Sequence, residues 1–244
     1  ACQGNHDLGY IAAEYRYSMM PNYIYPERNS AFAKTLVSTG TNYEGIHTME
    51  NSAYEFHDEA WGDLLIISFE FAPRDEALDW ARQLIESERF VNHKVIILTH
   101  SFLATNGDRI VEEGYKLTPR NWAQAVWEKL IYPSKNIKMV LCGHTGNPPK
   151  IRKGEDVDFH MTTSYRVDKA ADGHEVVQMM FNSQNGDGSW NGNGGDCWLR
   201  ILEFKPDGKA IGVRTFSPLF ALSRHTQHLA WRTAEYDQFL ITIK

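Results

Sequence analysis

The chain has 244 residues, of which 42% are hydrophobic and 12% aromatic, with 31 acidic and 25 basic side chains and a formal net charge of −6. A chain of this size buries a sizeable core, and its hydrophobicity and charge exclude intrinsic disorder. The acidic balance gives no overall electrostatic reason to bind nucleic acid or an anionic membrane, and no apolar run is long enough to cross a bilayer. Three cysteines are too few for a disulfide scaffold, although one bridge remains possible.

The first sixty residues show little periodicity. The chain opens with Ala1-Cys-Gln-Gly-Asn-His-Asp7, without an initiator Met or a signal peptide, so we expect a chain that was processed or cut from a longer one. Residues 8–60 are rich in Tyr, Asn and Glu, which predicts loops with short helical pieces.

Strands and helices alternate in the middle of the chain. Continuous apolar runs of strand length lie at 63–69, 94–98 and 137–142. Such runs are typical of a sheet covered on both faces. An amphipathic helix starts at Pro73, and Thr118-Pro119 supplies the N-cap and first position of a second helix. This order predicts an α/β core with at least partly parallel strands.

The last third of the chain has a different character. Strands without intervening helices are predicted at 175–181, 198–204, 210–216 and 238–243. The turn Pro206-Asp-Gly208 makes the middle pair an antiparallel hairpin. Residues 146–173 predict loops with one short strand at 158–162, and the glycine-rich 185–196 predicts a long loop. With no repeat and no linker composition, residues 1–244 are interpreted as one domain in which 175–244 is mainly antiparallel β.

Two predicted strands end next to a histidine, at His100 and His144. The carboxyl edge of an open α/β sheet is where binding sites are built, and neutral imidazole is a common metal ligand. A lone histidine in this position is usually structural, but two of them together with Gly4-Asn-His-Asp7 favour a site. Cys142 lies beside His144 in an apolar strand, which indicates a buried thiol rather than a ligand.

Other polar and aromatic residues carry weaker signals. Arg74 could hold a phosphate, whereas Asp75 and Glu76 fit the first turn of a helix equally well. Trp190 is a candidate stacking platform in the glycine-rich loop. Structural or surface roles are expected for the remaining histidines, at positions 47, 57, 93, 160, 174, 225 and 228. A serine-hydrolase reading is disfavoured, because there is no Gly-x-Ser-x-Gly motif and Ser101 merely follows His100 in sequence.

The ordered blocks Gly4-Asn-His-Asp7, Thr99-His100 and Gly143-His144 resemble the calcineurin-like metallophosphoesterases. Further segments are similar to a branch of that superfamily whose members are often secreted bacterial proteins; they lie at 69–76, 193–204 and 213–218. The resemblance implies a metallophosphatase-like two-sheet α/β/β/α sandwich and a periplasmic or extracellular location. It also implies hydrolysis of phosphoesters by a metal-activated water.

The resemblance assigns roles by position. Asn5, His100 and His144 would be three ligands of one divalent metal ion, which would be Zn, Mn or Fe. His6 would protonate the leaving oxygen or steady the phosphoryl oxygens, and Asp7 would orient His6. We add Arg74 to the catalytic group as a phosphate contact. No organic cofactor site is predicted.

The chain also departs from the family pattern. The Asp-x-His and Gly-Asp-x-x-Asp blocks of the family precede the Gly-Asn-His block, but only Ala1–Gln3 precede it here. Gly146 stands where the family has a ligand of the second metal. The chain therefore corresponds to about the carboxyl-terminal two thirds of the family domain, and it can supply one metal site at most. Because the N-terminal strands are missing or replaced, we expect a homo-oligomer or a partner segment that covers the exposed sheet edge.

These observations predict a metal-dependent hydrolase of phosphomonoesters or phosphodiesters acting on a small-molecule ester, with no nucleic acid or membrane partner. Two alternatives stay open. The same site could hydrolyse a carboxylic ester, or the chain could be a non-catalytic remnant or binding module.

Overall fold

The seven-stranded sheet that forms the centre of the molecule has the order β1-β2-β3-β4-β5-β7-β6. The computed structural model describes residues 1–146, 163–182 and 194–243. The strands of this sheet are β1 (Leu36–Thr41), β2 (His47–Asp58), β3 (Gly62–Ser68), β4 (Lys94–Leu98), β5 (Ile137–Cys142), β6 (Thr163–Lys169) and β7 (Glu175–Phe181). A second sheet contains β8 (Leu199–Phe204), β9 (Ala210–Phe216), β10 (Trp231–Arg232) and β11 (Phe239–Thr242).

The helices are short apart from one. They are α1 (Ser30–Thr35), α2 (Asp75–Glu86), α3 (Ala123–Val126) and α4 (Pro218–Ala221). A π-helical turn, Trp127–Ile131, continues α3. Turns of 3-10 helix lie at Asn5–Asp7, Met20–Asn22, Pro26–Arg28, Gly194–Cys197 and Gln227–Leu229. No helix among the described residues has the length and apolar character needed to cross a bilayer.

Parallel pairing at the centre of the large sheet confirms the predicted α/β core. The pairs β3–β4, β4–β5 and β5–β7 are parallel, whereas the outer pairs β1–β2, β2–β3 and β6–β7 are antiparallel. The carboxyl ends of β4 and β5 therefore lie next to each other at one edge of the sheet. The predicted hairpin between β8 and β9 is also present.

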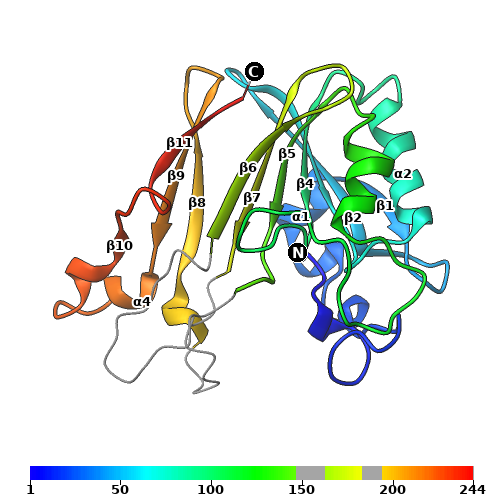
Figure 1. Cartoon of the computed structure of the whole chain (residues 1–244), viewed down its shortest axis with the longest axis horizontal. Helices are drawn as coiled ribbons and strands as arrows, with labels where there is room; N and C mark the ends of the chain where they lie inside the picture. Colours follow the sequence, from blue (N-terminus) through cyan, green and yellow to red (C-terminus); the bar gives the residue numbers. More distant parts are fainter. Residues whose placement is uncertain (147–162, 183–193, 244) are drawn as a thin grey trace.

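The two faces of the large sheet are covered differently (Figure 1). On one face, α2 and α3 pack against the sheet and bury a core that includes Ile67, Ile97 and Val140. On the other face, the small sheet contributes Ile211 and Val213 to a second core against Met139 and its neighbours. These layers arise because the central strands are apolar on both sides and need cover on each.

The prediction of loops throughout residues 8–60 is wrong. β1 and β2 form a hairpin within this range, and β2 has twelve residues. The pattern hides the strand because Asn51 and Ser52 are polar yet fully buried. Asn51 Nδ2 donates to the Glu70 carboxylate at 3.1 Å, and Ser52 Oγ donates to the Met49 carbonyl at 3.1 Å, so burial there depends on hydrogen bonds rather than on apolar alternation.

The predictions for the second helix and for residues 146–173 also differ from the structure. The second helix does not begin at Thr118-Pro119, where the peptide bond is cis, but at Ala123 after the N-cap Trp122. β6 lies inside the stretch predicted to be loops, while the short strand expected at 158–162 falls outside the described residues.

β8 pairs with β9 on one side, and no described strand pairs with its other edge. Leu199 and Ile201 on this strand are 40% and 36% exposed. An open edge with apolar side chains is a site where another strand can add. The expectation of a homo-oligomer or a covering partner segment stays a prediction.

Candidate metal centre

Three side chains that the sequence nominates as ligands meet at the carboxyl edge of the large sheet. His100 and His144 follow β4 and β5, and the ladder extends past both strands because Gly143 N donates to the His100 carbonyl at 2.9 Å. Asn5 arrives from the N-terminal 3-10 turn. His100 Nε2 lies 3.0 Å from Asn5 Oδ1 and 3.1 Å from His144 Nδ1.

Asn5 Oδ1 and His144 Nδ1 both face the same nitrogen, His100 Nε2. Asn5 Nδ2 donates to the Tyr115 hydroxyl at 3.0 Å, which turns the amide oxygen toward His100. His144 presents its Nε2 to the Glu113 carboxylate at 3.5 Å, which favours a proton on Nε2 and a free lone pair on Nδ1. His100 Nε2 carries at most one proton, so it cannot satisfy both Asn5 Oδ1 and His144 Nδ1.

The backbone around Gly4 and His144 has features that the candidate site requires. A Cβ atom on Gly4 would lie 3.0 Å from His100 Cε1, so glycine permits the N-terminal turn to approach the imidazole. His144 has a φ of 67°, which costs an ordinary residue about 1–3 kcal/mol. Asn182 Nδ2 donates to the His144 carbonyl at 3.1 Å and helps to hold this conformation. Strain of this kind is concentrated at functional sites.

The aromatic ring of Phe71 packs against the imidazoles of both His100 and His144. The fully buried Phe71 ring lies 5.8 Å, centroid to centroid, from each of the His100 and His144 rings, in edge-on contact. Arg16, itself buried, donates to the carbonyl of Phe71 at 2.8 Å. The loop that carries Phe71 is therefore fixed from the N-terminal segment.

Glu113 and Tyr115 are the site residues that sequence reasoning missed. Burial alternates along 112–117, with the side chains of Glu113, Tyr115 and Leu117 turned inward. In Figure 1 this loop, in green, runs beside the dark blue N-terminal segment. Leu117 N donates to the Ala13 carbonyl at 3.1 Å, which joins the two segments. The sequence gives little signal for this alternation, because the stretch is too polar and too short to predict a strand.

The donor set fits a divalent cation. Ligand distances of about 2.0–2.1 Å hold neighbouring donor atoms about 2.8–3.0 Å apart at octahedral angles and about 3.3–3.4 Å apart at tetrahedral angles. The separations of 3.0 and 3.1 Å around His100 Nε2 fall between these values. Glu113 Oε2 is buried and has no hydrogen-bond partner among the described residues. The described residues contain no group of three His, Cys, Asp or Glu side chains around one point, and the candidate centre relies on the amide of Asn5 as its third donor.

Burial and the nearby His144 lower the pKa of His100 to about 4. His100 is therefore neutral at neutral pH, which is the form that binds metals. An unfolded chain has an ordinary histidine pKa near 6.5, so the unfolded state takes up more protons as the pH falls between these two values. Protonation of His100 thus destabilises the fold in this window.

We expect the metal-free protein to lose about 2 kcal/mol of unfolding free energy through His100 between about pH 7.5 and pH 5. Urea unfolding with chelator present measures the loss at the two pH values. His100→Gln has no titrating ring at this position, so its pH dependence should be flatter by that amount. Equal slopes for the wild type and the variant would contradict the prediction.

The structure brings His6 and Asp7 close to the ligands but gives Asp7 another contact. His6 is exposed, and its Nδ1 lies 2.8 Å from the Ile11 carbonyl. Asp7 Oδ2 accepts from Gly4 N at 2.7 Å and closes the N-terminal turn. The Ile11 carbonyl is thus the contact that the structure gives His6, and the orientation of His6 by Asp7 stays a prediction.

Arg74 has structural partners instead of an open guanidinium. It is buried, its Nε donates to Glu70 Oε1 at 2.8 Å, and one Nη donates to the Thr41 carbonyl at 2.7 Å. A guanidinium already bonded in this way joins α2 to the β1–β2 hairpin. We therefore leave Arg74 out of the site proposed below.

The remaining nominated residues lie away from the ligands or outside the described residues. Cys142 packs against the main core, and burial raises its pKa to about 12, as expected for an inert thiol. His225 and His228 are exposed on the C-terminal segment. Trp190 and His160 lie outside the described residues.

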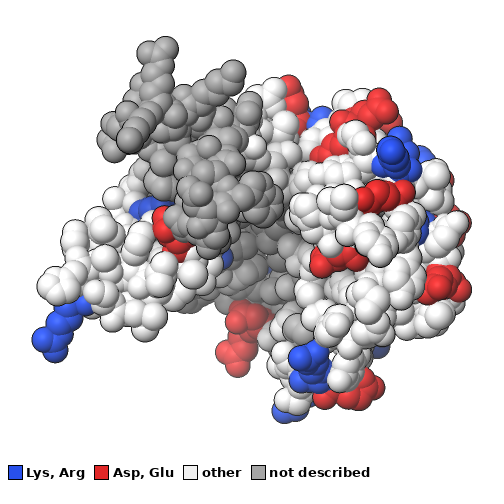
Figure 2. All heavy atoms as spheres, turned by 90° about the horizontal axis from the view of Figure 1, so that it is seen from below, with Lys and Arg blue, Asp and Glu red and all other residues white. Residues whose placement is uncertain are grey.

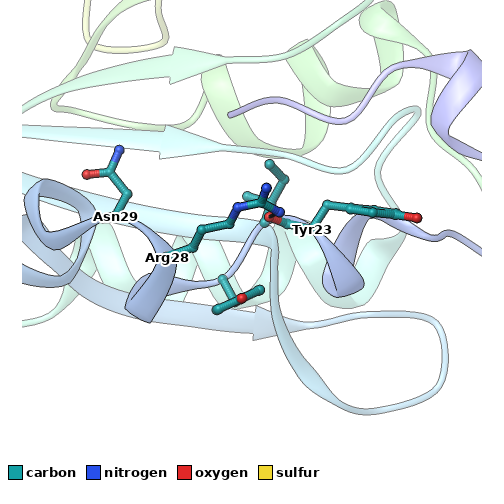
Figure 3. Close-up of a pocket in the computed structure, with 5 residues that line it drawn as sticks. Tyr23, Arg28 and Asn29 are labelled. Carbon is teal, nitrogen blue, oxygen red and sulfur yellow. Dashed lines mark hydrogen bonds between the residues drawn. The ribbon is translucent and has the colours of Figure 1, made fainter.

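A separate hollow of about 470 Å³ lies near the N-terminus, lined by Tyr23, Ile24, Tyr25, Arg28 and Asn29 (Figure 3). Arg28 donates to the Tyr23 carbonyl at 3.0 Å. None of the three ligand candidates lines it. On the face of the molecule shown in Figure 2, acidic and basic side chains are interspersed rather than gathered in one basic block.

Comparison with known proteins gives a distant match. No family model matches the chain. It is 24% identical over 215 residues to the uncharacterized protein YvnB of Bacillus subtilis (strain 168), a match that covers 88% of this chain and 14% of YvnB. The chain thus corresponds in length to a small part of that much longer relative.

Proposed function

We propose that the protein is a metal-dependent hydrolase of phosphoesters, and that Asn5, His100 and His144 hold one divalent ion. The observation that carries the proposal is the convergence of Asn5 Oδ1 and His144 Nδ1 on His100 Nε2. One proton cannot satisfy Asn5 Oδ1, His100 Nε2 and His144 Nδ1 together, whereas one cation can bind all three.

The proposed overall architecture is the two-sheet α/β/β/α sandwich of the metallophosphatases. The large mixed sheet, its cover of α2 and α3 on one face, and the small sheet on the other face support it. Ligands on the loops that follow two adjacent parallel strands also agree with it.

A bound Zn, Mn or Fe ion supplies Lewis acidity, which lowers the pKa of water and neutralises charge on a phosphoryl oxygen. The chain itself keeps His100 neutral by burial, so protons do not compete for its nitrogen at neutral pH. With Nδ1 directed at the Ile11 carbonyl, His6 in its protonated form has Nε2–H available to protonate a leaving oxygen.

Gly146 limits the site to one ion from this chain. A Cβ atom at this position would lie 2.9 Å from Asn182 Nδ2, so a histidine here requires Asn182 to move. Asn182 in turn holds the His144 carbonyl. We therefore propose one metal site built by the described residues.

The test is hydrolysis of p-nitrophenyl phosphate, bis-p-nitrophenyl phosphate and p-nitrophenyl acetate by protein loaded with Zn²⁺, Mn²⁺ or Fe²⁺. We expect turnover of a phosphoester that disappears with chelator and returns with metal, at about one bound ion per chain. Turnover of the acetate alone moves the reaction to carboxylic esters. Absence of both bound metal and chelator-sensitive turnover contradicts the proposal and leaves a binding module.

A further inference from the structure

One loop contacts two of the three ligand candidates, and each contact is on the side away from His100. Glu113 Oε1 lies 3.5 Å from His144 Nε2, while His144 Nδ1 faces His100. Tyr115 Oη accepts from Asn5 Nδ2, while Asn5 Oδ1 faces His100. Only Gly114 separates the two contact residues.

Glu113 and Tyr115 are themselves held in place. Ser101, directly after His100 in sequence, donates to Glu113 Oε1 at 2.7 Å. The Glu113 side chain is 12% exposed, so its charge acts in a medium that screens it weakly. The Tyr115 ring packs edge-on against Phe71 with centroids 5.3 Å apart.

We propose that Glu113 and Tyr115 are positioning residues that fix the tautomer of His144 and the amide orientation of Asn5. The proposal deepens the function above and rests on it for the role of the ion, but the effect on His144 is a property of the metal-free protein. Partners of this kind orient metal ligands and make the ligating nitrogen more basic.

The Glu113 carboxylate attracts the proton of His144 to Nε2 and leaves the Nδ1 lone pair free. Without the carboxylate, the free imidazole can place its proton on Nδ1, toward His100, and then cannot donate a lone pair from that atom. Without the Tyr115 hydroxyl, the Asn5 amide loses the acceptor that distinguishes its nitrogen from its oxygen. Either change lowers the fraction of protein ready to bind a cation.

The first test is the tautomer of His144, measured by long-range ¹H–¹⁵N NMR correlation on the metal-free full chain. We expect a proton on Nε2 in the wild type and a mixture of tautomers in Glu113→Ala. Glu113→Gln keeps a carbonyl oxygen that can accept a hydrogen bond from His144 Nε2–H, so this variant should retain the Nε2 tautomer. Glu112→Ala is the matched control, because Glu112 is the exposed neighbour with the same side chain.

The second test is the affinity for Zn²⁺, measured by competition with a chromophoric chelator. We expect Glu113→Ala and Tyr115→Phe to weaken binding about 10–100-fold. Glu113→Gln should weaken it less, and Glu112→Ala should not change it. Tyr115→Phe keeps the ring packing against Phe71, so it tests the hydroxyl even if Glu113→Ala folds poorly.

The outcomes separate the two proposals. A His144 tautomer that is the same in the wild type, Glu113→Ala and Glu112→Ala overturns the role of Glu113. Unchanged Zn²⁺ affinity in Tyr115→Phe overturns the role of Tyr115. A tautomer that depends on Glu113 in a protein that binds no metal supports the positioning role and overturns the proposed hydrolase.

Discussion

Replacing His100 by Ala should lower metal-dependent ester hydrolysis by at least about a hundredfold. Its Nε2 is the atom that both Asn5 Oδ1 and His144 Nδ1 face, so the variant removes the centre of the donor set. Loss of a residue that merely orients a ligand already costs about 10–100-fold, and loss of a ligand should cost more. The measurements are kcat/KM on the best p-nitrophenyl substrate and the metal bound per chain.

His144→Ala should produce a similar loss, and the double variant should be little worse, because ligands of one ion act as a unit. His225→Ala is the matched control, since His225 is exposed and lies on the C-terminal segment. Wild-type activity and full metal content in His100→Ala would contradict the proposed centre. They would show that the metal and the activity do not depend on His100.

Phe71→Ala should destabilise the fold by about 3–5 kcal/mol. The ring is fully buried and packs edge-on against Tyr115, Trp122 and the imidazoles of His100 and His144. Truncation leaves a cavity beneath the site, so the variant should also bind Zn²⁺ more weakly than the wild type. Urea unfolding at neutral pH and chelator competition measure the two effects.

Phe56→Ala is the comparison, because Phe56 lies on β2 and is 41% exposed. It should cost much less stability and should leave Zn²⁺ affinity unchanged. Phe71→Leu retains most of the buried apolar volume and should fall between the two. Equal losses in Phe71→Ala and Phe56→Ala would show that Phe71 does not support the site.

Strands that are buried on both faces were predictable because their composition is continuous and apolar. The predicted ranges 94–98, 137–142 and 175–181 coincide with β4, β5 and β7. The predicted range 210–216 coincides with β9, although Arg214 on this strand is exposed. β2 was missed because its burial depends on partners: Asn51 binds a carboxylate of Glu70 that is nineteen residues away in sequence. No local pattern reports such a partner.

The same distinction applies to the candidate centre. Gly4, Asn5, His100 and His144 were recognisable because each stands at a chain turn or beside a strand end, where local sequence indicates a site. Arg74 was nominated on the same grounds, but tertiary contacts with Glu70 and Thr41 give it a structural role. The type of a side chain limits what it can bind, whereas its neighbours in space decide what it does bind.

By itself, the sequence determined the strand–helix alternation and the two histidines at adjacent strand ends, because buried strands and sharp turns impose local rules on composition. Only the tertiary structure decided which atoms face one another. In the folded chain, Asn5 Oδ1 and His144 Nδ1 face His100 Nε2. Tyr115 contacts the other side of Asn5, and Glu113 contacts the other side of His144. The two contacts of Asn5 span 95 and 110 residues of sequence, and the contact between His144 and His100 spans 44, so their geometry depends on the packing of the whole sheet edge.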